Sequence, residues 1–521
     1  MKRRDFLKKI AFGAAAITLA PKLLQGQSAE KLNFIYILAD DLGYGDVNLG
    51  LDELDVFKNP HVRTPNLARL AGESIVFTHH YASSPVCSPS RAGLLTGRTP
   101  TRCNINLWIS DLTDNDKMFL SGGEITIAEV LKKAGYTTAV IGKWHLNGAD
   151  WEKKENWTGW TGSFPNQQGF DYAMVSKENP HETRKLRRNS QEDPGDFFLD
   201  TESVHGEPLG TIKGFSSQII TDTAIDWLKY KRDKSKPFFL YLPYDAVHEK
   251  IVNPVEYNSL YNTGDYKKDK YYANVTYLDA QIGRVLDALD ALRLTHNTVV
   301  FFSSDNGPEV LDSYRGSPRS YGTACPLHGQ KKQLFEGGIR VPGMVRWPGH
   351  IKHRVSQLPN SNLDVMPTTC ELAGVQPPKD RPLDGTSIVG HLLEDKQVQR
   401  RVPLYWQFER RNQNWQITGT GYNRRYDGKV KIDIPTPKVV VRQDNYVLRG
   451  YYKGQAQPYS LPTKYELYDV VNDPAEATEL SHTKPEIFTD LRDKLEKMHA
   501  DVNKERMKTA LEIERRINQN I

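Results

Sequence analysis

The feature that most constrains the fold of this chain is a set of short, continuous apolar runs that each end in polar residues. Four runs have strand length and are rich in Val, Ile, Phe and Tyr: Phe34–Ala39, Thr138–Ile141, Phe238–Leu242 and Thr298–Phe302. Apolar side chains at successive positions are typical of strands buried on both faces. Because helical patterns lie between the runs, we predict an α/β fold whose large, mixed but mostly parallel sheet is sandwiched by helices.

The helical patterns between the runs have recognisable ends. One begins with the capping residue Thr64 and Pro65, another covers Ile125–Ala134, and a third spans Ser216–Lys231. The longest, Tyr272–Leu292, carries a single apolar stripe. A stripe of this kind is suited to packing against one face of a sheet.

The polar residues that follow the four runs are candidates for a binding or catalytic site. In chain order they are Asp40 and Asp41, Lys143 and His145, His248, and Asp305 and Asn306. Singly, each has an ordinary explanation, because Asp-Asn-Gly is a common turn, adjacent aspartates can cap a helix, and a lone histidine is usually structural. Ligands of open parallel sheets, however, bind outside the carboxyl ends of the strands. The shared position of these residues therefore predicts one site at that edge.

Basic residues are concentrated at the start of the chain. The whole chain has 69 Lys and Arg against 64 Asp and Glu, but residues 1–29 hold six basic groups and one acid, so the remainder is neutral by count. A neutral body predicts no nucleic-acid partner. Its 38% hydrophobic and 26% charged residues are ordinary for a folded protein, and no later apolar run approaches the roughly 20 residues that a membrane helix needs.

Residues 1–29 have the arrangement of an export signal, with a basic start, a mildly apolar stretch and then small or polar residues. Arg3 and Arg4, followed by Phe6 and Leu7, resemble a bacterial twin-arginine signal, which addresses folded proteins to the twin-arginine export machinery. A basic amphipathic helix is the alternative, and the absence of a polar face disfavours it. We therefore expect a periplasmic or secreted protein.

Four cysteines in so long a chain are too few for a disulfide framework, and their spacing leaves the pairing of Cys103, Cys325 and Cys370 open. Cys87 differs, because it opens the segment Cys-Ser-Pro-Ser-Arg-Ala-Gly-Leu-Leu-Thr-Gly. Pro89 lies where a first helical turn would begin, and a helix N-terminus offers free N–H groups to an anion. Arg91 adds a permanent positive charge.

This segment resembles the signature of the sulfatases, C-x-P-S-R followed by L-L-T-G. The resemblance implies an alkaline-phosphatase-like fold. It also implies that a formylglycine-generating enzyme or an anaerobic sulfatase-maturating enzyme oxidises Cys87 to formylglycine (3-oxoalanine), whose hydrate is the nucleophile. The alternatives are a buried cysteine at an ordinary helix start and a plain thiolate nucleophile. The length of the match disfavours the former and the family resemblance the latter.

The resemblance continues through most of the chain and implies a metal site. Ala39–Asp46 and Ser304–Gly307 are similar to the two halves of the family's calcium site. Carboxylate and amide oxygens suit Ca²⁺ or Mg²⁺, and the resemblance favours Ca²⁺. The implied ligands are Asp40, Asp41, Cys87, Asp305 and Asn306.

The catalytic residues are implied by the same resemblance. Gly142–Leu146 is similar to the family's G-K-W-H-L element, and Gly329–Lys331 followed by Glu336–Pro342 resembles the element that supplies a second sulfate-binding lysine. A sulfate monoester is an anion with a poor leaving group, so the site must neutralise charge, supply a nucleophile and protonate the departing oxygen. The implied catalytic residues are Cys87, Arg91, Lys143, His145, His248 and Lys331.

In the implied mechanism, a hydroxyl of the hydrated aldehyde at position 87 attacks sulfur while His248, with Lys331, protonates the leaving oxygen. His145 then takes a proton from the second hydroxyl, which expels sulfate. Two positions depart from the family pattern. His248 is followed by Glu-Lys where the family usually has H-x-P, and His328 stands where many relatives have Arg, a change expected to affect substrate contacts.

We predict three parts: a signal segment at 1–29, a catalytic domain at 30–400 and a C-terminal subdomain at 401–521. Alternating runs at Lys438–Arg442 and Asn445–Arg449 predict a small antiparallel sheet, and a helical pattern extends from near Pro485 toward Arg516. Glu466–Pro474 resembles a segment typical of the smaller C-terminal domain of sulfatases.

The substrate expected from the resemblance is a sulfated carbohydrate. The overall pattern is closest to N-acetylgalactosamine-6-sulfatase-like members, and glycosaminoglycan, ulvan and carrageenan all remain open. A long loop at Trp151–Gly214, with Trp157, Trp160 and the basic run Arg184–Arg188, either holds a sulfated sugar chain or is a solvated surface. Two other functions compete: a phosphomonoester, phosphodiester or phosphonate hydrolase of the same superfamily, and a degenerate glycan-binding homologue. The complete catalytic set disfavours the latter.

Overall fold

The computed structural model describes residues 31–519 except 56, 58, 110–117, 148–163, 177–195, 202–203, 212–213, 249–250, 310–320, 409–435 and 453–459. The predicted signal segment at 1–29 therefore lies outside the described residues, as do Trp151, Trp157, Trp160 and the basic run Arg184–Arg188. Within the described ranges, no helix is long and apolar enough to cross a membrane.

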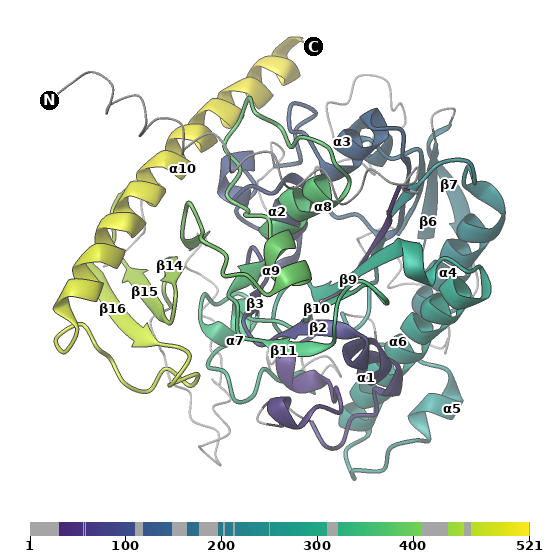
Figure 1. Cartoon of the computed structure of the whole chain (residues 1–521), viewed down its shortest axis with the longest axis horizontal. Helices are drawn as coiled ribbons and strands as arrows, with labels where there is room; N and C mark the ends of the chain where they lie inside the picture. The colour runs from purple at the N-terminus through teal and green to yellow at the C-terminus, as the bar shows by residue number, and fades with distance from the viewer. Residues whose placement is uncertain are drawn as a thin grey trace, which may run out of the picture.

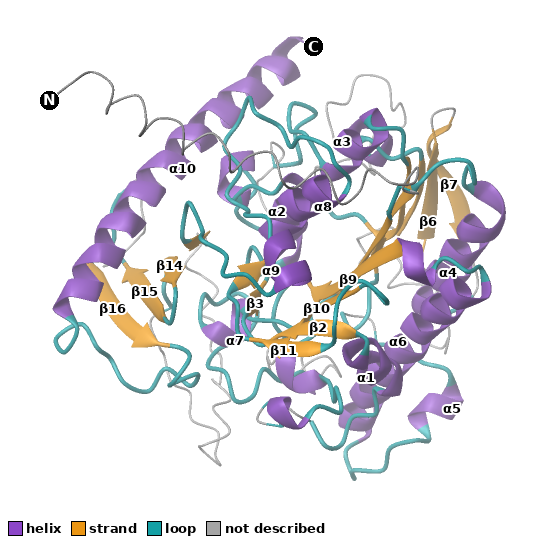
Figure 2. Cartoon of the chain, in the orientation of Figure 1, coloured by secondary structure: helices purple, strands orange, loops and turns teal. Residues whose placement is uncertain are grey.

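A ten-stranded mixed sheet forms the centre of the larger part of the molecule (Figure 2). Its strand order is β11-β2-β10-β9-β1-β8-β4-β5-β6-β7. The four apolar runs of the sequence are its four neighbouring central strands, and all four are parallel. Their bounds are β9 (Thr298–Ser304), β1 (Asn33–Ala39), β8 (Phe238–Pro243) and β4 (Thr137–Lys143).

The outer strands make the sheet mixed. β10 is antiparallel to both β9 and β2, whereas β5 continues the parallel order beyond β4. The outer strands are β2 (Ser74–Phe77), β10 (Gly343–Arg346), β11 (Arg354–Ser356), β5 (Tyr172–Ser176), β6 (Asp196–Thr201) and β7 (Val204–Thr211). A separate two-stranded pair joins β3 (His80–Tyr81) to β12 (Asn360–Ser361).

Helices cover both faces of the large sheet, which confirms the predicted fold class (Figure 1). Side chains alternate along β1, so Phe34 and Tyr36 pack on one face and Ile35 and Ile37 on the other. The first face carries α2 (Cys87–Thr96), α3 (Ile127–Lys133) and α8 (Val365–Leu372). The second carries α1 (Pro65–Gly72), α4 (Ser216–Asp226) and α6 (Tyr266–Ala291). The short helices are α5 (Val255–Asn258), α7 (Glu336–Ile339) and α9 (Val389–Glu394).

Side-chain caps set two helix starts that the apolar pattern misplaced. α3 begins two residues later than predicted, because Thr126 accepts a hydrogen bond from the Glu129 amide and the Glu129 carboxylate accepts one from the Thr126 amide. α6 begins at Tyr266, six residues earlier than predicted, because the Asp265 side chain accepts hydrogen bonds from the first turn. The third predicted pattern is α4 followed by a π-helix at Trp227–Lys231.

The stretch Trp151–Gly214 is not a loop throughout, contrary to our expectation. Its described part contributes β5, β6 and β7, which extend the sheet beyond β4. Only β5 pairs in parallel with a central strand, and β6 and β7 form an antiparallel edge. Edge strands need not be apolar on both faces, so they lack the continuous runs that identified the central strands.

A smaller antiparallel sheet and a long helix complete the chain, as predicted. The sheet has the order β13 (Leu404–Gln407), β14 (Val439–Gln443), β15 (Tyr446–Tyr451) and β16 (Lys464–Asp469). Helix α10 (Pro485–Gln519) covers it and continues along the larger part of the molecule (Figure 1). A separate apolar core joins sheet and helix, in which Val441 and Leu448 lie with Leu491 and Leu495. A domain boundary between residues 400 and 401 stays a prediction.

Candidate active site

The polar residues that follow the four central strands lie together. Because β9, β1, β8 and β4 are parallel neighbours, their carboxyl ends are side by side. The residues that follow each strand therefore lie at the same edge of the sheet. Asp40 and Asp41 follow β1, Lys143 ends β4 and precedes His145, His248 follows β8, and Asp305 and Asn306 follow β9.

Arg91 of helix α2 joins three of these strand ends. Its guanidinium is fully buried and donates to Asp40 Oδ2 at 2.9 Å and to Asp305 Oδ2 at 2.7 Å. A third hydrogen bond runs from Nη1 to the main-chain carbonyl of Lys143 at 2.8 Å. The planar guanidinium has donors enough for all three partners, which Lys could not match at fixed geometry.

Cys87 stands at the first position of α2, so the helix begins two residues earlier than the Pro89 start that we expected. Its side chain is buried, and Sγ lies 3.6 Å from Asp40 Oδ1. Burial and then the negative charge of Asp40 raise the pKa of the Cys87 thiol well above its ordinary value. All four cysteines of the chain are free thiols in the structure.

Two buried lysines face the two adjacent aspartates. Lys143 Nζ donates to Asp40 Oδ2 at 2.6 Å, and Lys331 Nζ donates to Asp41 Oδ2 at 2.7 Å. Burial by itself lowers a lysine pKa, but the carboxylates outweigh it, so that Asp40 raises the pKa of Lys143 and Asp41 raises that of Lys331. Both side chains therefore carry a positive charge inside the site.

Two glycines allow the loops to approach closely enough for these contacts. Gly142, before Lys143, has φ of 128°, and a Cβ there would lie 1.9 Å from the Pro243 carbonyl oxygen of β8. A Cβ on Gly307 would lie 1.9 Å from the Gly337 carbonyl oxygen, in the segment after Lys331. No other residue type fits such backbone contacts without displacement of the neighbouring loop.

The charges of the buried centre balance. Burial would raise the pKa of Asp40, but Lys143, His248 and Arg91 together hold it below its ordinary value. Burial, with the nearby charge of Asp40, raises the pKa of Asp305 to about 6. Three carboxylates thus face three cations, and a bound divalent cation would leave a net positive charge that favours an anionic ligand. The six groups are Asp40, Asp41, Asp305, Arg91, Lys143 and Lys331.

The donor atoms at this centre suit a hard divalent cation. Asn306 Nδ2 donates to Asp41 Oδ1 at 2.7 Å. The buried Oδ1 of Asn306, by contrast, accepts no hydrogen bond from the described residues. A buried oxygen without a donor is costly, and a cation beside it removes that cost. Carboxylate and amide oxygens are the preferred ligands of Ca²⁺. One ligand atom each of Asp40, Asp41, Cys87 and His248 also lie within 4.8 Å of one another.

The two histidines have different surroundings. His248 Nε2 lies 3.7 Å from Asp41 Oδ2, and the His248 side chain is 25% exposed. His145 is half-buried, and its Nε2 lies 2.9 Å from the Ile109 carbonyl oxygen, so Nε2 carries the hydrogen and donates it. Burial, followed by the charge of Lys143, lowers the pKa of His145 well below its usual value. The ring is therefore neutral, with the basic lone pair on Nδ1.

Sequence reasoning missed one buried acid next to this centre. Glu309 is 2% exposed, and its carboxylate lies 2.9 Å from Lys332 Nζ and 3.6 Å from Lys331 Nζ. Its position four residues after Asp305, in the segment that leaves β9, was the available signal. The Ile109 carbonyl was also missed, since main-chain acceptors leave no mark in a sequence.

His328, which departs from the family pattern, has contacts with the C-terminal part of the chain. Its ring stacks on Phe335 with 4.2 Å between ring centres, and its Nδ1 lies 3.7 Å from a carboxylate oxygen of Glu476. Burial, followed by the charge of Arg449, lowers the pKa of His328 to about 4. Its expected effect on substrate contacts stays a prediction.

The fold is that of an alkaline-phosphatase-like α/β protein, and the described residues place a buried cluster of carboxylates and cations at the carboxyl edge of its sheet. A family model described as Sulfatase matches residues 32–375, and one described as N-sulphoglucosamine sulphohydrolase, C-terminal, matches residues 328–501. The chain belongs to the sulfatase family, and it is a sulfuric ester hydrolase.

Individual relatives agree with this assignment. N-acetylgalactosamine-6-sulfatase of Mus musculus is 33% identical over 410 residues, which covers 75% of this chain and 74% of the relative. N-acetylgalactosamine-6-O-sulfatase of Bacteroides thetaiotaomicron is 29% identical over 565 aligned positions, covering 95% and 99%. The crystal structure of PsFucS1 sulfatase from Pseudoalteromonas sp. has a TM-score of 0.69 at 23% identity and covers 93% of both chains, which supports the fold.

Proposed function

We propose that this sulfatase is an exported enzyme that hydrolyses sulfate esters of a carbohydrate, with formylglycine formed from Cys87 and with a calcium ion. The observation that carries the proposal is the buried cluster in which three cations and three carboxylates surround the Cys87 side chain. Two relatives are named for the 6-sulfate of N-acetylgalactosamine, which supports a sulfated polysaccharide or its oligosaccharides as substrate. A twin-arginine signal at 1–29 and a maturation enzyme acting on Cys87 belong to the same proposal.

The chain's own residues would neutralise and hold the sulfate group. Arg91, Lys143 and Lys331 supply three permanent charges in a site from which water is largely excluded, where charge–charge interactions are stronger than in solution. Asp40, Asp41, Asp305 and Asn306 would hold the cation, which when bound adds positive charge and lowers the pKa of a coordinated hydroxyl. Formylglycine at position 87 supplies the nucleophilic hydroxyl.

The histidines are suited to opposite proton transfers. His145 is neutral with its lone pair on Nδ1, so it acts as the base that accepts a proton from the group at position 87. His248 is more exposed and faces Asp41, so it acts as the acid that protonates the leaving sugar oxygen, together with Lys331. The raised thiol pKa of Cys87 leaves little thiolate and disfavours the plain thiolate alternative.

Substrate preference tests the proposal. We expect an aryl sulfate to be hydrolysed with kcat/KM on the order of 10²-fold above that of the matching aryl phosphate, because the chain belongs to the sulfatase family. Oligosaccharides with 6-sulfated N-acetylgalactosamine are expected to release sulfate, whereas desulfated controls bind without reaction. Ulvan and carrageenan oligosaccharides complete the panel, with sulfate release measured by ion chromatography. A clear preference for phosphate would refute the proposed function.

Removal of the metal is expected to abolish activity and to lower thermal stability. After chelation with EDTA, we expect turnover to fall at least ~10²-fold, and Ca²⁺ to restore it better than Mg²⁺. Calcium at 100 times its Kd is also expected to stabilise the fold by about 2.7 kcal/mol, read as a rise in Tm. Asn306→Leu removes the buried oxygen acceptor, so this variant should lose much of the rise. An unchanged Tm in the wild-type protein would contradict the metal assignment.

A further inference from the structure

Glu309 contacts two consecutive lysines, of which Lys331 also pairs with Asp41 and Lys332 lies over the Trp108 ring. Lys331 Nζ lies 3.6 Å from one Glu309 carboxylate oxygen, and Lys332 Nζ lies 2.9 Å from the other. Glu309 is 2% exposed, and the lysine side chains are 6% and 13% exposed. Burial of these charges is tolerable only because they are paired. One carboxylate therefore sets the direction of both lysines.

For Lys331, Glu309 is a second anchor beside Asp41. Lys331 Nζ lies between Asp41, at 2.6 Å, and Glu309. Asp41 belongs to the proposed cation site, and a carboxylate bound to a divalent cation attracts a lysine less strongly. Glu309 is not part of that site, so its negative charge still attracts Lys331 when Asp41 binds the cation. The main chain supports the same arrangement, since the Lys331 amide donates to the Pro308 carbonyl next to Glu309.

For Lys332, the contacts lead to the segment that supports His145. Lys332 has φ of 71°, and its amide donates to the Pro85 carbonyl at 2.9 Å, two residues before Cys87. Its Nζ lies 5.7 Å from the centre of the Trp108 ring, within cation–π range. The residue after Trp108 is Ile109, whose carbonyl fixes the His145 ring. Left-handed backbone at a non-glycine residue persists only where surrounding contacts hold it.

We propose that Glu309 is a positioning residue of this sulfatase, which holds Lys331 toward the sulfate group and, through Lys332 and Trp108, steadies the segment that orients His145. The proposal rests on the catalytic role proposed for Lys331. Glu309 itself touches neither the ester nor the cation in this arrangement. Its effect on turnover therefore passes through other side chains.

A double-mutant cycle on an aryl sulfate tests this role. Glu309→Gln keeps the shape and removes the charge, and we expect kcat/KM to fall on the order of 10²-fold, as misplacement of a catalytic group by about 1 Å typically does. In a Lys331→Met background, measured at high enzyme concentration, the same change should lower the residual rate less than ~10-fold. Glu309→Asp retains the charge with a shorter reach, so its rate should lie between those of wild type and Glu309→Gln. This variant also serves if the glutamine variant fails to fold.

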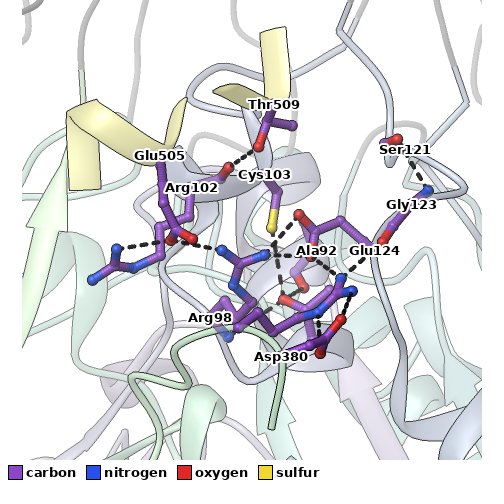
Figure 3. Close-up of polar contacts among 12 residues, drawn as sticks. Ala92, Arg98, Arg102, Cys103, Ser121, Gly123, Glu124, Asp380, Glu505 and Thr509 are labelled. Carbon is purple, nitrogen blue, oxygen red and sulfur yellow. Dashed lines mark hydrogen bonds and ion pairs between the residues drawn. The ribbon is translucent and has the colours of Figure 1, made fainter. Parts of the chain in front are cut away.

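Glu124 offers a matched control for lost stability. It is a buried carboxylate, 5% exposed, that pairs with Arg98 at 2.7 Å (Figure 3) and with Arg381 at 3.4 Å, and neither partner belongs to the proposed site. Glu124→Gln should lower Tm as Glu309→Gln does, but with kcat/KM near that of wild type. Equal rate losses in the two glutamine variants would overturn the proposal, because they would indicate a general loss of stability.

The remaining outcomes separate the two proposals. If Lys331→Met inactivates the enzyme while Glu309→Gln matches wild type, the positioning role is overturned and the proposed function stands. Full additivity of Glu309→Gln and Lys331→Met also overturns the positioning role. If Lys331→Met retains near-normal activity, the catalytic role of Lys331 is refuted, and the positioning role falls with it.

Discussion

Cys87→Ala is expected to lower kcat by about 10⁴- to 10⁶-fold, the range seen when a catalytic nucleophile is removed. The Cys87 side chain is buried at the first position of α2, 3.6 Å from Asp40 Oδ1, at the centre of the charged cluster. Alanine suits a helix and leaves Arg91 and its two carboxylate partners in place, so the fold should persist. The measurement is steady-state hydrolysis of an aryl sulfate, with circular dichroism as the test of folding.

Cys103→Ala is the matched control for this change. Cys103 is also fully buried and follows the same helix, but its Sγ lies 3.8 Å from Thr96 Oγ1 and outside the charged cluster. This variant should keep near-normal turnover. A mass spectrum of the peptide that contains residue 87 should show formylglycine in protein from the native host. Near-normal activity of Cys87→Ala, or active protein with an unmodified cysteine, would contradict the proposed chemistry.

Arg102→Ala is expected to give the largest loss of stability, about 3–5 kcal/mol in the free energy of unfolding. Arg102 is 1% exposed and lies in the short helix after α2, where it pairs with Asp384 at 2.9 Å and with two residues of α10, Asp501 at 2.7 Å and Glu505 at 2.9 Å. Figure 3 shows Arg98 and Arg102 reaching the same Glu505 carboxylate. Removal of the guanidinium leaves the Asp384 carboxylate, which is 4% exposed, without this cation, whereas Glu505 keeps its pair with Arg98.

Arg69→Ala provides the surface comparison for Arg102→Ala. Arg69 also has two close aspartate partners, Asp287 and Asp290, both at 2.6 Å, but its side chain is 33% exposed and theirs are 69% and 45% exposed. Exposed ion pairs contribute about 0–1 kcal/mol, so Tm should change little. Thermal unfolding of both variants measures the contrast. A Tm for Arg102→Ala within the range of Arg69→Ala would show that the contact with α10 contributes little.

The central part of the fold was predictable because fully buried parallel strands have a distinctive sequence. Residues 34–39 and 298–302 are apolar at nearly every position, and their burial on both faces of the sheet explains why. The edge strands β6 and β7 lacked this pattern, and the region was assigned to a loop. Helix starts were misplaced where a cap such as Thr126 or Asp265, rather than the apolar period, sets the first turn.

The composition of the site was also largely predictable, but several of its supports were not. Cys87 and Arg91 are four residues apart on one helix, so local geometry alone places them on the same face. The carboxylates and Lys143 converge because strand ends converge, whereas Lys331 comes from the segment between β9 and α7. Glu309 and the Ile109 carbonyl, by contrast, contact residues that are distant in sequence, and nothing local marks them.

The sequence by itself determined the sulfatase family, the parallel sheet and the set of charged side chains at its carboxyl edge. The family followed from the resemblance of motifs such as Cys87–Gly97 to those of sulfatases, whereas the sheet and its charged edge follow from local rules, namely the period of apolar residues, the spacing within one helix and the direction of parallel strands. Only the tertiary structure decided which carboxylate pairs with which cation, that Glu309 joins two lysines, and that α10 reaches back to Arg102 across 403 residues. Such pairings depend on how distant segments pack and exclude water. The attraction between two opposite charges is strong only where burial lowers the effective dielectric constant around them.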